Sequence, residues 1–416
     1  MKISEIKPEV FELAKQSEAE IKPMFENIDR IAELNTLKVM EAFQDNKVSD
    51  SCFAGTTGYG YDDLGRETLD NVYAQVFKTE AALVRIGFVN GTHALSAALF
   101  SLLKPGDTLL SVTGLPYDTL RNAIGISGDC HGSLKFYGIN YAQVDLLPDG
   151  TPDYDGIRKA AADSNVAAVL IQRSRGYENR PALSVEEIGK ICNTVKTVNS
   201  SINVMVDNCY GEFTEEHEPT EYGVDIMAGS LIKNPGGGIA PAGGYIVGKK
   251  DLVEKAAMRL TTPGIGGECG ASLGNNRLLF QGFFMAPHTV AQALKTATFC
   301  AAMLEKIGFA TSPASDELRH DIIQMVTLRT ADNMKKFCLG IQSGAPVDSY
   351  VVPEPWQMPG YECPVIMAAG AFIQGSSIEL SADGPMHEPY IAYMQGGITY
   401  ESGKLGIMMA ISEMLS

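Results

Sequence analysis

The fold class of this chain is decided by residues 166–171, VAAVLI, an apolar run that contains no polar residue. A strand with one face in water alternates apolar and polar residues, whereas a strand covered on both faces stays apolar along its length. Stretches with helical spacing separate several such runs, and the predicted strands are residues 83–86, 108–112, 166–171, 204–206, 225–227 and 244–247. We therefore predict an α/β fold in which helices cover both faces of a mostly parallel sheet.

Composition narrows the class of protein before any motif is considered. The chain has 416 residues and a formal net charge of −17, which repels nucleic acids and anionic membranes. Its apolar stretches are too short to cross a bilayer, and the first residues, MKISEIK, alternate in charge where a signal peptide would be apolar. We expect a cytoplasmic protein with no nucleic-acid or membrane partner.

The cysteines and acidic residues do not predict a metal centre. The eight cysteines are dispersed and form no C-x-x-C pair, so we expect reduced, mostly buried thiols. Aspartates and glutamates are equally dispersed and show no spacing typical of metal ligands.

Three segments are expected along the chain. Residues 1–45 carry apolar residues every three or four positions, which predicts an N-terminal helical segment. Residues 46–285 contain the predicted sheet and form the large domain. Residues 286–416 begin with a long helical pattern and form a smaller α/β domain, with candidate strands at 372–373 and 377–380.

Two polar residues that follow apolar runs indicate the chemistry of the large domain. Residues 204–210, VMVDNCY, place Asp207 at the end of a strand, and residues 230–238, SLIKNPGGG, place Lys233 before a glycine-rich turn. Ligands of α/β sheets bind at the carboxyl ends of strands, where burial can lower the pKa of a lysine so that it reacts with an aldehyde. An acid and an amine together suit pyridoxal phosphate, because the acid keeps the pyridine nitrogen protonated. Taken singly, Asp207 also fits a helix cap, and Lys233 fits a solvated loop residue.

A phosphate site is expected where a strand turns into the helix that begins near residue 91. Gly91, Thr92 and His93 open this helix, whose free N–H groups and dipole attract anions. Ser230 could add a hydroxyl to the same phosphate, and His93 either faces the cofactor ring or only begins the helix. Taken alone, a glycine turn of this kind also fits a purely structural role, and Ser230 fits a simple turn hydroxyl.

Aromatic and basic residues follow two other predicted strands. Tyr117 comes after residues 108–112 and could stack on a heteroaromatic ring, although a lone tyrosine also fits a packing role. Arg173, Arg175 and Arg180 come after the next strand, and a basic cluster in an acidic chain suggests a site for a carboxylate or phosphate.

This ordered set resembles the fold-type I pyridoxal-phosphate enzymes of the Cys/Met metabolism group. The longer motifs are similar to the methionine gamma-lyase-like family associated with aluminium resistance, and they are residues 58–61 GYGY, 114–120 GLPYDTL, 172–177 QRSRGY and 378–385 IELSADGP. The resemblance spans roughly residues 50–400. It implies a seven-stranded, mostly parallel sheet, a smaller α/β C-terminal domain, and a homodimer or homotetramer with sites at the subunit interface.

The resemblance also implies a role for each candidate residue. Lys233 binds the cofactor aldehyde, Asp207 pairs with the pyridine nitrogen, and Tyr117 stacks on the ring. The residues implied around the phosphate are Gly91, Thr92 and Ser230, and His93 is a further candidate for binding the cofactor.

Two positions depart from the pattern of the wider group. There a tyrosine and an arginine two residues later reach the phosphate of the neighbouring subunit, whereas here Tyr59 is followed by Tyr61. The small-domain arginine that binds the substrate carboxylate has no counterpart near residues 376–390. We therefore expect Arg173 or Arg175 to bind the substrate carboxylate, with Tyr59 and Tyr61 in the substrate site.

The predicted function is a pyridoxal-phosphate-dependent carbon–sulfur lyase that acts on a cystathionine- or methionine-like amino acid. Lys233 removes the Cα proton and a thiol leaves by β- or γ-elimination. The same residues also suit transamination or aldol cleavage. The missing small-domain arginine permits a third alternative, a catalytically quiet cofactor-bound factor in stress or metal tolerance.

Overall fold

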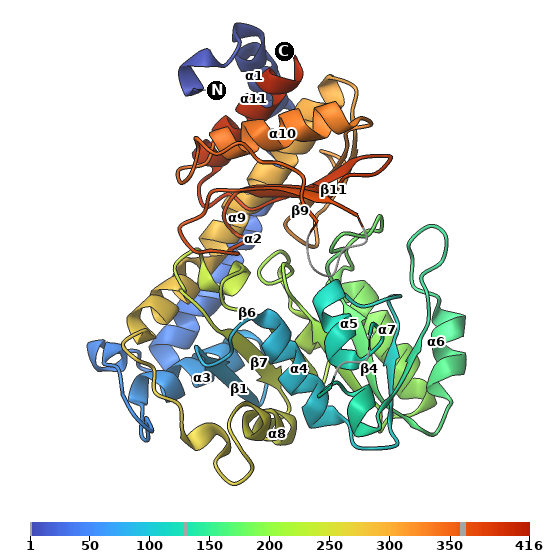
Figure 1. The fold of residues 1–416 in the computed structure, drawn as a ribbon. Helices are drawn as coiled ribbons and strands as arrows, with labels where there is room; N and C mark the ends of the chain where they lie inside the picture. Colours follow the sequence, from blue (N-terminus) through green and yellow to red (C-terminus); the bar gives the residue numbers. More distant parts are fainter. Residues whose placement is uncertain (1, 129–130, 358–362) are drawn as a thin grey trace. The chain divides into compact units, whose positions relative to one another are not determined.

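The computed structural model describes residues 2–128, 131–357 and 363–416 (Figure 1). By their contacts these residues form two units. One unit is Thr36–Phe284, and the other combines residues 2–35 with the described residues of 285–416. The division into three segments expected from the sequence stays a prediction.

The unit Thr36–Phe284 is built on a seven-stranded sheet with the strand order β1-β7-β6-β5-β4-β2-β3. Its strands are β1 (Ala81–Arg85), β2 (Thr108–Ser111), β3 (Asn140–Gln143), β4 (Val166–Gln172), β5 (Asn203–Asp207), β6 (Ile226–Ser230) and β7 (Gly244–Gly248). Strands β2 to β6 pair in parallel, and β7 runs antiparallel to both β1 and β6. The predicted α/β class, with a seven-stranded and mostly parallel sheet, is confirmed.

Helices cover the sheet because each presents an apolar face to it. The helices that lie wholly in this unit are α3 (Leu64–Val76), α4 (Gly91–Leu102), α5 (Asp118–Ile124), α6 (Tyr154–Ala161), α7 (Val185–Val198) and α8 (Lys250–Leu260). Helix α4 contacts β6, β7 and α8, and its Leu95, Ala98 and Leu99 are buried in the core there.

The edge strand β3 was not predicted from the sequence. Its residues, NYAQ, are exposed or half-buried, so they lack the apolar run by which the central strands were found.

The second unit contains a five-stranded antiparallel sheet with the strand order β10-β11-β12-β9-β8. Its strands are β8 (Ala310–Ser312), β9 (Ile323–Thr327), β10 (Val365–Ala369), β11 (Ser381–Pro385) and β12 (Ile391–Gln395). The strands predicted at residues 372–373 and 377–380 are wrong, because both stretches form bends and turns. Strand β11, with the sequence SADGP, carries small and polar residues that do not identify a strand on their own.

Helices from both ends of the chain complete the second unit. They are α1 (Pro8–Glu20), α10 (Ala331–Ser343) and α11 (Tyr400–Met414), while α2 (Lys22–Asp45) and α9 (Asn276–Lys306) each run through both units. Val10 and Ala14 of α1 belong to the same hydrophobic core as α10 and α11. Across the described ranges, no helix is long and apolar enough to span a membrane.

Candidate cofactor and substrate site

The carboxyl ends of two neighbouring parallel strands bring together an acid and a hydroxyl. Strand β5 ends at Asp207 and strand β6 ends at Ser230, and both side chains are buried. Asp207 Oδ1 accepts a hydrogen bond from Cys209 N at 3.1 Å, which fixes the carboxylate at the strand end. This is the edge at which parallel α/β sheets bind ligands.

Lys233 lies three residues beyond the end of β6, where the chain enters a short 3₁₀ helix (Asn234–Gly236). Its Nζ is 4.1 Å from the centroid of the Tyr210 ring. Tyr210 has a φ of 73°, a left-handed conformation that is uncommon for a bulky residue and that occurs preferentially at functional sites. The backbone after β5 is therefore held in an unfavourable conformation at the residue that contacts Lys233.

The pKa of Lys233 differs from the value expected from the sequence. Burial opposes the charge of Lys233, but the acidic groups of Cys209, Tyr210, Asp207 and Tyr117 outweigh it and hold the pKa of Lys233 well above its ordinary value. The expected lowering of this pKa is thus wrong for the chain alone. Burial also raises the pKa of Asp207, and the attraction of Lys233 only partly offsets it.

The start of α4 forms a close approach to both strand ends. A Cβ built on Gly91 would lie 3.0 Å from the Cβ of Ser230 and 3.7 Å from Cys209 Sγ. Asn90 caps the helix by accepting a hydrogen bond from His93 N at 2.9 Å. The remaining N–H groups of the first turn and the positive end of the helix dipole lie beside the Ser230 hydroxyl, an arrangement that binds phosphate groups.

Thr92 and His93 extend this first turn. Thr92 Oγ1 lies 2.7 Å from Thr119 Oγ1. His93 Nδ1 accepts a hydrogen bond from Val89 N at 3.2 Å, and burial, together with the charge of Arg259, lowers the pKa of His93. His93 is therefore neutral at pH 7 and supports the turn through one ring nitrogen.

Tyr117 follows β2 and is positioned by the end of β4. Its backbone N donates to Gln172 Oε1 at 2.8 Å, and a Cβ built on Gly176 would lie 3.7 Å from the Tyr117 ring. The loop that contains Arg175, which is buried, therefore lies next to the ring. The hydroxyl of Tyr117 also contributes to the raised pKa of Lys233, so the Tyr117 side chain lies near the Lys233 amine.

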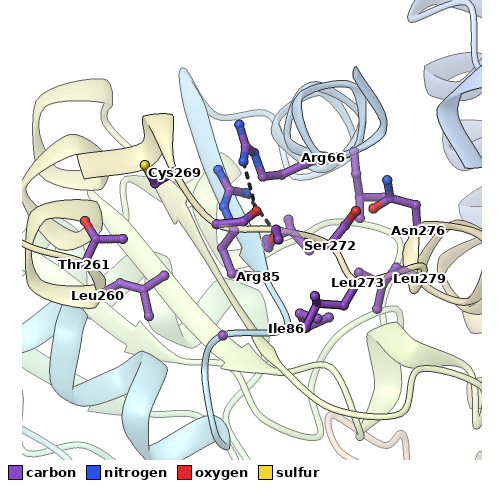
Figure 2. Close-up of a pocket in the computed structure, with 15 residues that line it drawn as sticks. Arg66, Arg85, Ile86, Leu260, Thr261, Cys269, Ser272, Leu273, Asn276 and Leu279 are labelled. Carbon is purple, nitrogen blue, oxygen red and sulfur yellow. Dashed lines mark hydrogen bonds between the residues drawn. The ribbon is translucent and has the colours of Figure 1, made fainter. Parts of the chain in front are cut away.

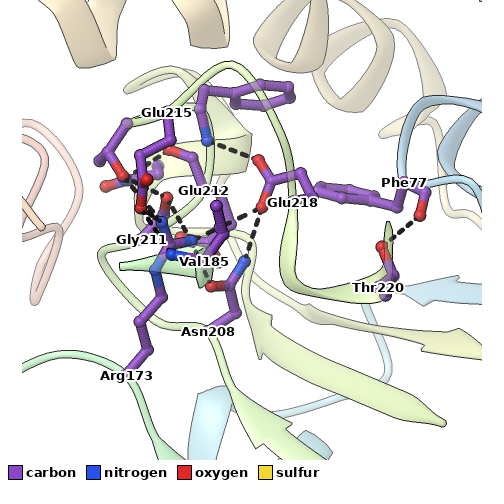
Figure 3. A network of polar contacts seen from close by, with 12 residues as sticks. Phe77, Arg173, Val185, Asn208, Gly211, Glu212, Glu215, Glu218 and Thr220 are labelled. Atoms are coloured by element: carbon purple, nitrogen blue, oxygen red, sulfur yellow. Dashed lines mark hydrogen bonds and ion pairs between the residues drawn. The ribbon is translucent and has the colours of Figure 1, made fainter. Parts of the chain in front are cut away.

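Arg173 lies in a separate polar network (Figure 3). It is fully buried, and its N–H groups donate to Leu183 O, Asn208 Oδ1, Gly211 O, Thr214 Oγ1 and Glu215 Oε1. These acceptors account for all five guanidinium donors. Arg180 is similarly bound to backbone carbonyls, those of Gln172 at 3.0 Å and Ser174 at 2.5 Å.

Tyr59 and Tyr61 lie on an exposed loop, with ring centroids 5.8 Å apart. This loop packs on residues 268–272, where Gly270 N donates to Tyr59 O at 2.9 Å. A hydrogen bond with the Cys269 thiol raises the pKa of Tyr61. Within one protomer the two rings thus contact each other, Tyr61 contacts Cys269, and the described contacts do not join either ring to Lys233.

The sequence did not single out Tyr210, Gln172 or Glu212 as site residues. Tyr210 contacts Lys233, and Gln172 anchors Tyr117. Glu212 is fully buried beside them and binds Tyr245 Oη at 2.7 Å. The only sequence signal for the first two was their place in the runs DNCY and QRSRGY, directly after strands.

These residues match the chemical groups of pyridoxal phosphate. The cradle at Gly91 and Ser230 suits a phosphate, because a side chain on Gly91 would close it. The buried acid Asp207 suits the pyridine nitrogen, and the amine of Lys233 suits the aldehyde. Together with the sheet topology, this set defines the protein as a fold-type I enzyme.

The comparisons with known proteins give the family. The family model described as methionine gamma-lyase matches residues 10–415, and the chain belongs to this family. YnbB, an uncharacterised protein of Bacillus subtilis, is 51% identical over 403 residues, which is 97% of this chain and 96% of YnbB.

Solved structures agree with this assignment. A carbon–sulfur lyase involved in aluminium resistance from Clostridium novyi is 52% identical, with a TM-score of 0.95 over 98% of this chain and 96% of that chain. The pyridoxal-5'-phosphate-dependent protein YhfS of Escherichia coli is 18% identical, with a TM-score of 0.62 over 92% of this chain and 95% of its own, and it shares the fold.

The resemblance found in the sequence is thus confirmed. The predicted class, a pyridoxal-phosphate-dependent carbon–sulfur lyase, is confirmed as well. The family acts on small amino-acid substrates.

Proposed function

We propose that the substrate is a cystathionine- or methionine-like amino acid, cleaved by β- or γ-elimination at the site around Lys233. One observation carries this proposal. Asp207 and Tyr117 lie close enough to Lys233 to stabilise its charge, at the carboxyl ends of the parallel strands and beside the cradle formed by Gly91 and Ser230. The carbon–sulfur lyase from Clostridium novyi, at 52% identity, supports the same choice of bond.

Each residue of the chain has a distinct task in this proposal. The bound cofactor supplies an electron-accepting ring. Asp207 keeps the ring nitrogen protonated, Tyr117 covers the ring, and Gly91, Thr92 and Ser230 hold the phosphate. Lys233 takes the proton from Cα as the general base.

Arg175 is the better candidate for the substrate carboxylate. Arg173 has its five donors bound to protein acceptors, whereas the loop of Arg175 lies next to Tyr117. A guanidinium at this position can bind a carboxylate with two parallel hydrogen bonds.

We further infer a homodimer or homotetramer in the cytoplasm, in which Tyr59 and Tyr61 reach the site of a neighbouring subunit. Their exposure supports this inference, since Tyr59 is 75% exposed in one protomer. Sizing with light scattering tests it, and a monomer at working concentration would contradict it.

The attachment of the cofactor and the reaction are tested together. Borohydride reduction followed by peptide mapping should place the cofactor on Lys233. With a cystathionine- or methionine-like substrate, the protein should release a thiol, a 2-oxo acid and ammonia in equal amounts, and Lys233→Ala should release none. Formation of a new amino acid without a thiol would indicate transamination instead.

A further inference from the structure

A cavity whose lining includes none of the residues around Lys233 lies in the unit Thr36–Phe284 (Figure 2). Its volume is about 280 Å³, close to the lower end of the range typical of small-molecule sites. The end of β1 and the start of α3 form one wall, and residues 260–261 and 269–279 form the other. Leu69, Val84, Leu260 and Leu279 give it a largely apolar lining.

Two buried arginines line this cavity. Arg66 is 3% exposed and Arg85 is 7% exposed. Nη1 of Arg85 binds Asp70 Oδ1 at 2.7 Å and Val84 O at 2.9 Å, which fixes the orientation of the guanidinium. Arg66 is held by Gly60 O and Gly270 O through its own Nη1.

Part of each guanidinium has no acceptor among the described residues. Nε of Arg66 and Nε of Arg85 are buried without a hydrogen-bond partner there, and Nη2 of Arg85 makes no hydrogen bond either. Nε and Nη2 share one edge of the guanidinium plane, the edge that binds a carboxylate with two parallel hydrogen bonds. A buried donor without a partner is unfavourable, so an anion at this edge would stabilise the protein.

Charged groups of both signs surround the cavity. The carboxylate of Asp70 binds Arg85, and the buried carboxylate of Asp63 binds Ser272 and Asn276, which line the cavity. The carboxylate of Glu67 beside Arg66 is mostly in water. An anionic ligand is therefore favoured by the unpaired edge of the Arg85 guanidinium and not by an excess of positive charge.

We propose that this cavity is a binding site for a small carboxylate with a short apolar chain, whose carboxylate binds the Nε and Nη2 edge of Arg85. The apolar chain packs on Leu69, Leu260 and Leu279. None of the residues that line the cavity belongs to the group around Lys233.

Gly267 allows a sharp test. A Cβ built on Gly267 would lie 3.9 Å from Arg85 Nη2 and 3.9 Å from Ala257 Cβ, so a side chain fits there at ordinary contact distance. Gly267→Asp would supply an internal carboxylate to Arg85, and Gly267→Ala makes the same backbone change without the charge.

The experiment measures binding of butanoate to the cofactor-loaded protein by calorimetry and by the shift in thermal midpoint. Butanamide, which has no charge, and inorganic phosphate, which has no apolar chain, are the comparison ligands. We expect saturable binding of butanoate by the wild type and Gly267→Ala. In Gly267→Asp we expect the affinity to fall at least about tenfold and the midpoint without ligand to rise.

Removing Arg85 alone would leave Asp70 buried without its cation, so the second variant is the double substitution Asp70→Asn with Arg85→Gln. It should fold and lose butanoate binding. The proposal would be overturned if butanamide or phosphate bound as well as butanoate, if Gly267→Asp bound it as tightly as Gly267→Ala, or if the double variant kept it.

Discussion

At the scale of single residues, the two arginines that the sequence placed together have different environments. Both side chains are buried, but Arg173 is paired with Glu215 at 2.7 Å, whereas Arg175 lies on the loop beside Tyr117. We expect Arg173→Gln to lower the free energy of unfolding by about 3–5 kcal/mol, since it leaves buried carboxylates unpaired. Arg175→Gln should instead raise KM for the amino acid about tenfold or more.

Steady-state kinetics and denaturant unfolding of both variants separate the two roles. The absorbance of the lysine-bound cofactor serves as the control that each variant is folded. A raised KM in Arg173→Gln together with an unchanged KM in Arg175→Gln would contradict the assignment.

Glu212 gives a prediction about pH. Burial raises its pKa from 4.5 to about 8, although a hydrogen bond from Tyr245 Oη opposes the shift. Between pH 4.5 and 8 the folded protein binds a proton that the unfolded chain has lost, so this residue makes stability fall as pH rises through that window. The slope is up to about 1.4 kcal/mol per pH unit.

Glu212→Gln should remove this slope and match the wild type at pH 4.5. Urea unfolding across the window measures it, with the exposed Glu254→Gln as the matched control. An equal slope in wild type and Glu212→Gln would show that Glu212 is already ionised in the folded protein.

At the scale of elements, Asp63 joins the start of α3 to the loop at Ser272 and to the start of α9. It caps α3 through Arg66 N at 3.0 Å and binds Ser272 Oγ at 2.6 Å and Asn276 Nδ2 at 3.0 Å. Although burial opposes its charge, these hydrogen bonds together with one from Thr56 lower its pKa to about 2. Asp63→Ala should cost at least about 2 kcal/mol of stability.

The pH dependence of that cost follows from the lowered pKa. The stabilisation is present above pH 3.8 and is lost as pH falls toward about 2, so the difference between wild type and Asp63→Ala should shrink over this range. Asp62→Asn is the control, because Asp62 is exposed and asparagine tolerates its φ of 55°. A difference that stays constant down to pH 2 would exclude an ionised Asp63 as the cause.

Elements with an unbroken apolar pattern were predictable from the sequence, and elements without one were not. Residues 166–171 identified β4, and residues 204–206 identified β5. A strand buried on both faces consists of an unbroken run of apolar residues, which can be recognised from the strand's own sequence. Strand β11 depends on pairing with β10 and β12, which its own residues do not encode. Likewise, the motif around Asp207 could be recognised in the sequence. The contact of Tyr210 with Lys233 could not, because it depends on a left-handed backbone conformation at residue 210.

At the scale of the whole molecule, the start of the chain contributes to the core of the unit that holds its end. Glu18 of α1 binds Tyr400 Oη at 2.7 Å and Lys404 Nζ at 2.7 Å, and Val10 is fully buried in the same core as α11. Residues nearly 400 positions apart thus share one hydrophobic core, and we expect α1 to stabilise α11.

Val10→Asp should therefore unfold α11 (Tyr400–Met414) selectively. An unpaired buried carboxylate costs about 3–5 kcal/mol, and this cost falls on the unit whose core contains Val10. Hydrogen exchange should show lost protection in α11 and α10, with β4 to β6 of the other unit much less affected. Phe11→Asp is the matched control, since Phe11 is 49% exposed and adjacent in sequence. Equal loss of protection in β4 to β6 would show that the two units unfold as one, because the destabilisation would then have crossed from one core to the other.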